Sequence, residues 1–240
     1  MKYVALLALI FMAAWSTTLE AQRGGRGAAP PATPRQMAPI DVTGYWVSVV
    51  AEDWKYRMVT PKKGVFDGVP LNPEGRKVGE GWDPARDEAA GEQCKAYGAG
   101  AIMRVPGRLN ISWQDDRVLK IETDAGTQTR LFRFAASSPP TESTWQGHSV
   151  AQWNVPGRSL KVVTTNLRAG YVRRNGVPYS DKTTVTEYWD LNTLPNGDQW
   201  LTVTTELVDP TYFARPYVTS SDFKKLPGPA GWNPTPCAAK

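Results

Sequence analysis

The sequence predicts an all-β protein in which about ten antiparallel strands follow one another as a meander. Runs rich in Val, Thr, Tyr and Trp recur at intervals of roughly ten residues from Leu109 onward, a spacing typical of sandwiches and barrels. Turn-forming dipeptides separate these runs. A chain of 240 residues can bury such a sheet as one domain. Closure into a barrel would remove the exposed sheet edges.

The first residues have the features of an export signal, which we assign to residues 1–21. Lys2 supplies a positive start, Val4–Trp15 an apolar run, and a cleavage region follows. Because the run is too short to favour a membrane span, we expect no transmembrane segment after signal removal and a periplasmic or secreted protein. A retained N-terminal anchor is the alternative. Residues 22–38 are dense in Gly, Pro and Ala and predict a disordered linker, so 39–240 would form the single barrel domain.

The charge of the chain argues against a nucleic-acid partner. The sequence pI is about 9.2, yet from Pro39 onward 24 Lys and Arg stand against 22 Asp and Glu. Three of the five net positive charges belong to Arg23, Arg26 and Arg35. Nucleic-acid binding needs a basic face on the folded domain, and this domain is nearly neutral.

Two cysteines, Cys94 and Cys237, are present in a chain that we expect to be exported. Two is the minimum for one disulfide, and disulfides persist outside the cytoplasm. We therefore predict a bridge that pins the C-terminal segment to the body, with two unpaired thiols as the alternative. Neither cysteine has the spacing of a metal or redox site, and we expect no cofactor.

The strands are interrupted early in the domain. Val47–Val50 and Trp54–Val59 are predicted as the first two strands from their aromatic and β-branched content. A short helical insertion at about 72–95 follows, because Asn72 and Asp83 each precede a proline at a helix start. This insertion would act as a lid or plug, or as a flap that covers a sheet edge.

The remaining strands are each bounded by turn residues such as Pro156-Gly157 and Asn196-Gly197. They are predicted at Leu109–Gln114, Arg117–Thr123, Gln128–Phe134, Ser149–Asn154, Ser159–Leu167, Thr183–Leu191, Gln199–Val208 and Tyr217–Lys224.

Side chains alternate along a strand, so each strand has two faces of different character. In the last strand but one, Leu201 and Val203 share one face and Trp200 and Glu206 the other. If the aromatic and polar face points inward, the interior is a ligand cavity; if it points outward, it is a wet outer surface. The alternation leaves both arrangements open.

Three residues are candidates for proton transfer. His148 is the only histidine, and histidine is the side chain that ordinarily titrates near neutral pH. Glu187 and Glu206 lie in consecutive predicted strands, where a carboxylate pair supplies one acid and one base. The alternatives are a merely hydrogen-bonded histidine and glutamates that are solvated or paired with Lys or Arg. There is no G-x-S-x-G nucleophile signature, and one histidine gives too few metal ligands.

Aromatic residues at strand spacing are either pocket walls or core. The candidates for ligand binding are Trp113, Trp145, Trp153, Trp189, Trp200 and Tyr179.

Two motifs carry a resemblance to known proteins. The Gly147–Val150 segment, with Trp153 behind it, is similar to uncharacterised exported bacterial proteins with a G-H-S-V-x-x-W core. The similarity covers 70–220 and implies no particular activity. Relatives carry further histidines where this chain has Tyr179 and Thr184. The Gly44–Trp46 element, G-x-W, resembles the opening of lipocalins and other calycins and implies a calycin-like barrel.

The leading expectation is an exported, lipocalin-like protein that binds a small, largely apolar or aromatic molecule in an aromatic-lined barrel cavity. The alternative is a cofactor-independent isomerase, cyclase or hydratase in which His148 or Glu187 moves a proton. For either role we expect His148 and Glu187 to line one cavity. A third reading, an envelope protein that works through surface contacts, needs no pocket.

Overall fold

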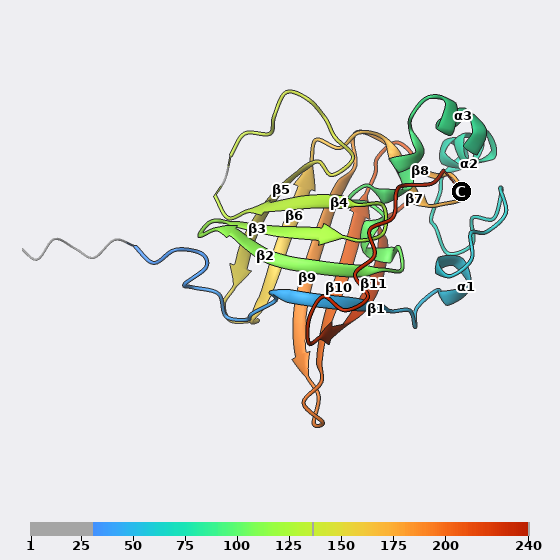
Figure 1. Cartoon of the computed structure of the whole chain (residues 1–240). Coiled ribbons are helices and arrows are strands. Elements are labelled where there is room, and N and C mark those ends of the chain that lie inside the picture. Colours follow the sequence, from blue (N-terminus) through green and yellow to red (C-terminus); the bar gives the residue numbers. More distant parts are fainter. Residues whose placement is uncertain (1–30, 136, 240) are drawn as a thin grey trace, which may run out of the picture. The chain divides into compact units, whose positions relative to one another are not determined.

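The computed structural model describes residues 31–135 and 137–239 (Figure 1). The predicted signal peptide, 1–21, and the predicted linker up to residue 30 lie outside the described residues. From Ala32 onward the chain forms one compact unit.

A closed β-barrel is the centre of this unit (Figure 1). Among the described residues nine strands form its wall, in the order β1-β11-β10-β9-β6-β5-β4-β3-β2. Their bounds are β1 Gly44–Val49, β2 Arg108–Asp115, β3 Val118–Thr123, β4 Gln128–Arg133, β5 His148–Asn154, β6 Ser159–Thr165, β9 Thr184–Thr193, β10 Gln199–Val208 and β11 Tyr217–Leu226. The all-β barrel expected from the sequence is confirmed.

One join in the barrel differs from the expected antiparallel meander. Eight of the nine described wall pairings are antiparallel, but β4 and β5 run parallel. Only two residue pairs connect them, Phe132 with Ser149 and Arg133 with Val150. A parallel join needs a long return connection between the two strands, and the segment after β4 provides it.

Two further corrections concern short elements. Trp54–Val59, predicted as a strand, contains the helix α1, Trp54–Arg57. The two neighbours of β1 are β2 and β11, so the closed wall has no edge left for a second early strand. The strands β7, Gly170–Arg173, and β8, Val177–Tyr179, were not predicted; they form a separate two-stranded sheet.

The helical insertion is confirmed, and its helices begin where the sequence indicates. In α2, Pro73–Glu80, the Asn72 side chain accepts a hydrogen bond from Gly75 N at 2.9 Å. In α3, Pro84–Ala89, Asp83 accepts one from Ala85 N at 3.0 Å. These caps satisfy N–H groups that a helix start leaves without partners. Two 3₁₀ turns follow, η1 Gln93–Tyr97 and η2 Ile102–Arg104, and the helices gather at one end of the barrel (Figure 1).

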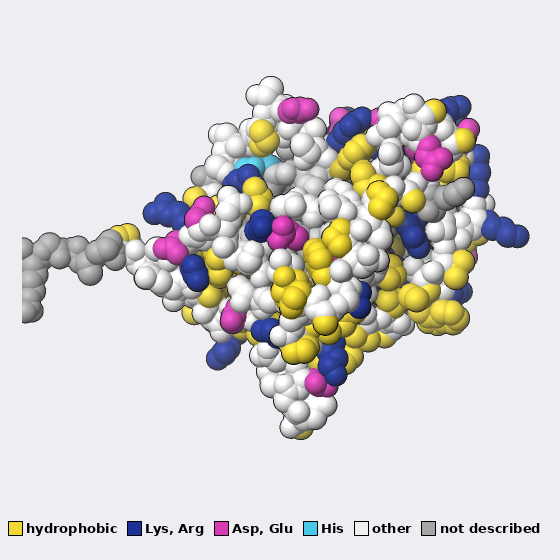
Figure 2. Space-filling view, in the orientation of Figure 1, with side chains coloured by type: hydrophobic (Ala, Val, Ile, Leu, Met, Phe, Trp, Pro, Cys, Tyr) yellow, Lys and Arg dark blue, Asp and Glu magenta, His cyan; other side chains and the backbone are white. Residues whose placement is uncertain are grey.

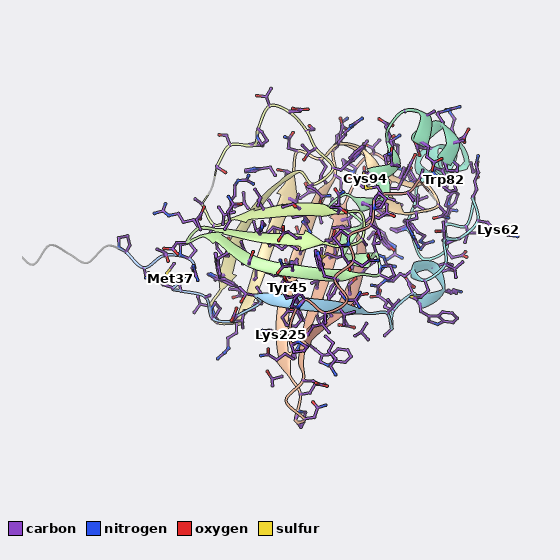
Figure 3. The ribbon with its side chains drawn as sticks, viewed as in Figure 1. Met37, Tyr45, Lys62, Trp82, Cys94 and Lys225 are labelled. Atoms are coloured by element: carbon purple, nitrogen blue, oxygen red, sulfur yellow. A yellow bond between two sulfur atoms is a disulfide. The ribbon has the colours of Figure 1, made fainter. Side chains whose placement is uncertain are left out.

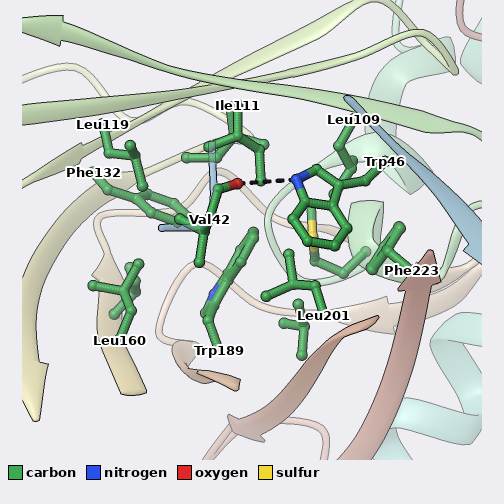
Figure 4. Packing of buried hydrophobic residues seen from close by; sticks show 14 of the residues in the cluster. Val42, Trp46, Leu109, Ile111, Leu119, Phe132, Leu160, Trp189, Leu201 and Phe223 are labelled. Atoms are coloured by element: carbon green, nitrogen blue, oxygen red, sulfur yellow. Dashed lines mark hydrogen bonds between the residues drawn. The ribbon is translucent and has the colours of Figure 1, made fainter. Parts of the chain in front are cut away.

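Side chains fill the barrel interior. The aliphatic face of β10 points inward, with Leu201 and Val203 fully buried, whereas Trp200 and Glu206 are partly exposed on the outer face. Trp46 is fully buried, and its Nε1 donates to Val42 O at 2.9 Å (Figure 4). The aromatic and polar face of this strand is therefore an outer surface rather than a cavity wall.

The chain before β1 is ordered further toward the N-terminus than the predicted linker 22–38 allows. Pro34 O accepts a hydrogen bond from Trp153 Nε1 at 2.8 Å, and Arg35 N donates to Asp116 O at 3.2 Å. Composition alone misses these bonds because backbone groups of the segment pair with the barrel. Ile40 and Val42, a few residues later, are buried in the core.

The predicted disulfide is confirmed. Cys94 in η1 is bonded to Cys237, with their Cα atoms 5.1 Å apart. Cys94 lies at the helical end of the barrel, opposite the end where Met37 lies (Figure 3). The bridge holds the C-terminal segment beside the loop after β3, where Thr235 N donates to Asp124 O at 2.8 Å.

Replacing both cysteines, Cys94→Ser/Cys237→Ser, should lower the free energy of unfolding by about 2–5 kcal/mol, because the bridge closes a long loop in the unfolded chain. Urea unfolding followed by far-ultraviolet circular dichroism measures the change. A reductant should destabilise the natural protein and leave the double variant unaffected. Equal stability of the two proteins under oxidising conditions would contradict this account.

Candidate functional site

An ion pair crosses the barrel interior. Arg130 on β4 donates from NH1 to Glu187 Oε1 at 2.9 Å and from NH2 to Glu187 Oε2 at 2.6 Å. Both side chains are 0% exposed. Arg130 also lies over the Phe132 ring, 4.9 Å from its centroid. A bidentate guanidinium–carboxylate pair of this kind is the strongest arrangement of these two groups.

The ion pair belongs to a polar belt between two apolar cores. On the inward face of β9, Val185 belongs to one core and Trp189 to the other, with Glu187 between them. Other strands place buried hydroxyl groups inward, and Thr164 is 2.8 Å from Ser149 and 3.4 Å from Arg130 NH2. The members of the belt are Arg130, Ser149, Thr164, Glu187, Thr205, Thr219 and Ser221.

Glu187 has a structural role within the belt. Both of its carboxylate oxygens accept hydrogen bonds from Arg130, and the side chain has no exposed surface. A general base must come within hydrogen-bond reach of a substrate proton. Glu187 does not meet this condition in the folded barrel.

His148 lies on the other face of the wall. Its neighbour Ser149 points inward to Thr164, so His148 points outward, where it is covered and only 5% exposed. His148 Nε2 is 3.0 Å from Ser137 O, in the segment that connects β4 to β5. The Ser137 hydroxyl lies 3.2 Å from the same nitrogen, so this connecting segment covers the His148 ring. The expected shared cavity is not formed: His148 and Glu187 are on opposite faces of the sheet.

Glu206 does not pair with Glu187 either. In the β9–β10 register Glu187 is opposite Thr205 and Glu206 is opposite Thr186. Adjacent positions point to opposite faces, so Glu187 is inside and Glu206 outside. Because Glu187 and Glu206 are offset by one residue in this register, their carboxylates lie on opposite faces of the sheet.

The five predicted tryptophans divide into three groups. Trp189 is core, packed edge-on against Phe132 at 5.3 Å between ring centroids. Trp145 and Trp200 are partly buried outside the barrel interior; Trp145 stacks with the Arg168 side chain. Trp113 and Trp153 line an open groove, described below.

Tyr179 is fully buried at the helical end. A Cβ atom at either Gly98 or Gly170 would overlap its hydroxyl group, so these glycines make room for the ring. Burial raises the pKa of the Tyr179 hydroxyl, which stays protonated at neutral pH. Tyr179 is a packing residue in this arrangement.

The groove lies at the barrel end opposite the helices. Its volume is about 680 Å³. One wall is the segment before β1 and the other comes from β2 and β5, which are distant in sequence. The lining residues are Arg35, Ala38, Pro39, Ile40, Asp41, Val42, Thr43, Gly44, Ile111, Ser112, Trp113 and Trp153.

Three aromatic rings stand together beside the groove. The ring centroids of Trp113 and Phe134 are 5.4 Å apart, those of Phe134 and Trp153 5.0 Å, and those of the two tryptophans 6.4 Å. All three side chains are only partly buried. Partly exposed aromatic clusters are a common feature of small-molecule sites.

The groove also carries charge. The Asp41 side chain accepts from Thr43 Oγ1 at 2.7 Å and from Thr43 N at 2.9 Å. Partial burial raises the pKa of Asp41, but these hydrogen bonds, with the positive charges of Lys225 and Arg35, outweigh it and leave the pKa below its usual value. Asp41 is therefore ionised at neutral pH, and the Arg35 guanidinium lies on the same rim.

Sequence reasoning missed the residues that define these sites. Arg130 shares the inward face of β4 with Phe132, and that two-residue spacing was the available signal. The segment 33–38 was missed because its composition led us to assign it to the linker 22–38. In the described part of the chain no helix has the length and apolarity to cross a bilayer. Nor do three or more His, Cys, Asp or Glu side chains of those residues come together as metal ligands.

Comparison with protein-family models, curated proteins and solved structures finds no match to this chain.

Substituting Glu187→Gln should destabilise the protein by about 3–5 kcal/mol, because it leaves the Arg130 charge buried without its partner. Replacing both partners with methionine, Arg130→Met/Glu187→Met, should recover most of that loss, since no uncompensated charge remains. Urea unfolding of the three proteins measures the difference. A double variant less stable than Glu187→Gln would show that the polar belt needs its charges for more than mutual compensation.

Proposed function

We propose that this protein is a calycin-like binding protein whose ligand occupies the groove at the open barrel end. The observation that carries the proposal is that Trp113 and Trp153, from separate strands, line one groove of about 680 Å³. Pockets for small ligands have volumes of roughly 300–1,000 Å³. The filled interior favours the barrel end over the inside of the barrel as the place for a ligand.

The lining indicates the kind of ligand. Aromatic side chains favour a molecule with a flat apolar or aromatic face. Asp41 and Arg35 on the rim favour polar groups at the edge of that molecule, since each charge can exchange water for a hydrogen bond to the ligand. The proposed ligand is therefore a small aromatic or largely apolar molecule with a polar edge.

We place this activity outside the cytoplasm, in the periplasm or in secreted form. The Cys94–Cys237 disulfide supports that location, because such bonds persist in oxidising compartments. The apolar run near the N-terminus supports it as well.

A proton-transfer enzyme built on His148 and Glu187 has less support, because the two side chains lie on opposite faces of the wall. A surface-interaction role without a pocket does not account for the aromatic groove. Neither alternative is favoured by a separate observation.

The neutral aromatic probe N-phenyl-1-naphthylamine should bind the natural protein with a rise in probe fluorescence. Trp113→Ala should weaken that binding about tenfold, because it removes one aromatic wall of the groove. Fluorescence titration gives both dissociation constants.

The matched control is Tyr188→Ala, which removes an aromatic ring that is 37% exposed on the outer face of β9 and does not line the groove. It should bind the probe as the natural protein does. The groove would be rejected as the site if the two variants lost affinity equally, or if the natural protein bound no probe.

A further inference from the structure

Four arginines surround a small cavity at the helical end, far from the aromatic groove. Arg57 is on α1, Arg104 on η2, Arg173 on β7, and Arg174 follows it. The cavity volume is about 20 Å³, and Tyr56, Ala96, Ala101, Val105, Pro106 and Val172 complete its lining. Arg57 is 4% exposed, Arg173 6% and Arg104 8%.

Arg57 has the most unused donors of the four, and Arg104 Nη1 is also buried without a hydrogen-bond partner among the described residues. The Nε of Arg57 donates to Arg104 O at 2.9 Å. Both of its terminal nitrogens, NH1 and NH2, are buried and have no hydrogen-bond partner among the described residues. A buried guanidinium without an acceptor is costly, so these donors indicate a position for an acceptor that the protein itself does not supply.

The other three arginines are better satisfied. Arg104 forms an ion pair with Asp53 at 2.8 Å and lies 4.0 Å from Glu52. Arg173 donates to the backbone carbonyls of Val65 and Asp67, and Arg174 to that of Arg57. Backbone carbonyls carry no net charge. Positive charge around the cavity therefore exceeds negative charge.

Electrostatics at Arg57 agree with this geometry. Burial and the neighbouring positive charge of Arg104 lower the pKa of the Arg57 guanidinium, and together they outweigh the negative charges of Glu52, Asp222 and Asp53, which raise it. Arginine nevertheless stays protonated at neutral pH. An anion in the cavity would face two buried N–H donors and a net positive field.

The size of the cavity selects among anions. A group the size of a water molecule needs a cavity volume of about 10–15 Å³. The cavity at Arg57, with a volume of about 20 Å³, therefore takes at most two oxygen atoms. A carboxylate has two oxygens in one plane, which matches the planar donor fork of a guanidinium. Phosphate has four oxygens, of which at most two fit in this space, so it fills the cavity less completely than a carboxylate does.

We propose that the cavity at Arg57 is a binding site for a carboxylate, held by the two terminal nitrogens of Arg57 and the positive charge of Arg104. The site is independent of the groove at the other barrel end. Two kinds of molecule supply this group. One is a small free carboxylate, and the other is an amphipathic carboxylate with an apolar tail.

An apolar surface for a tail lies nearby. Pro106 lines both this cavity and an adjoining open depression formed with Trp54 and Met58. Trp54 and Met58 are 63% and 57% exposed. Hydrophobic side chains are gathered at the barrel end where α1 lies (Figure 2).

The test measures the melting temperature of the disulfide-bonded protein against sodium acetate, sodium octanoate and sodium phosphate at constant ionic strength. Saturating acetate should raise the melting temperature by about 3–8 °C. The variant Arg57→Met removes the charge and keeps an apolar stem; its affinity for acetate, from titration calorimetry, should fall about 10- to 100-fold. Without added anion it should be as stable as the natural protein, because loss of the Nε hydrogen bond to Arg104 O is offset by removal of two buried nitrogens without acceptors.

The control is Lys55→Gln, which removes one positive charge from the exposed side of the same helix and should respond to acetate normally. If octanoate binds the natural protein at least about tenfold more tightly than acetate, the result supports an amphipathic carboxylate as the ligand. If the two anions bind with equal affinity, the result supports a small free carboxylate. The proposal is overturned if acetate does not stabilise the natural protein, if Arg57→Met responds equally, or if phosphate stabilises more than acetate.

Discussion

The ion pair between Arg130 and Glu187 determines what the barrel interior can be. Removing two charges from water costs several kcal/mol each, and close bidentate geometry with further hydrogen bonds compensates for it; among the described residues only Arg130 Nε of this pair has no hydrogen-bond partner. The belt of inward hydroxyl groups supplies that polar surrounding, and the two apolar cores above and below it exclude water. With the interior so occupied, the groove and the arginine-lined cavity lie at the two ends of the barrel.

The two ends differ because different parts of the chain cover them. At one end the residues before β1 cross the opening, bury Ile40 and Val42 in the core, and leave a groove against two tryptophans. At the other end α1, the segment 96–106 and β7 enclose arginines around a cavity too small for an aromatic ring. The same barrel thus has a partly exposed aromatic cluster at one end and a group of mostly buried arginines at the other.

Local patterns in the sequence predicted most of the wall, because alternation and turn residues are local properties. The range Gln199–Val208 was predicted to the residue, and the caps at Asn72 and Asp83 follow from two or three adjacent side chains. What could not be predicted depends on contacts between distant segments. Alternation placed Glu187 beside Val185 on one face, but only the partner on β4 makes burial of that carboxylate tolerable. The expected pairing of His148 with Glu187 failed for the same reason, since one residue of register decides which face a side chain occupies.

The parallel pairing of β4 with β5 is the shortest pairing among the described strands of the barrel wall. Every other neighbouring pair of described wall strands has at least four residue pairs in register, whereas this one has two. Side-chain packing must therefore hold the wall together there, and the contact between Phe134, just after β4, and Trp153 on β5 spans the join. Those rings belong to the aromatic cluster beside the groove. A molecule bound across these rings would stabilise the barrel wall between β4 and β5, where the strands share the fewest residue pairs.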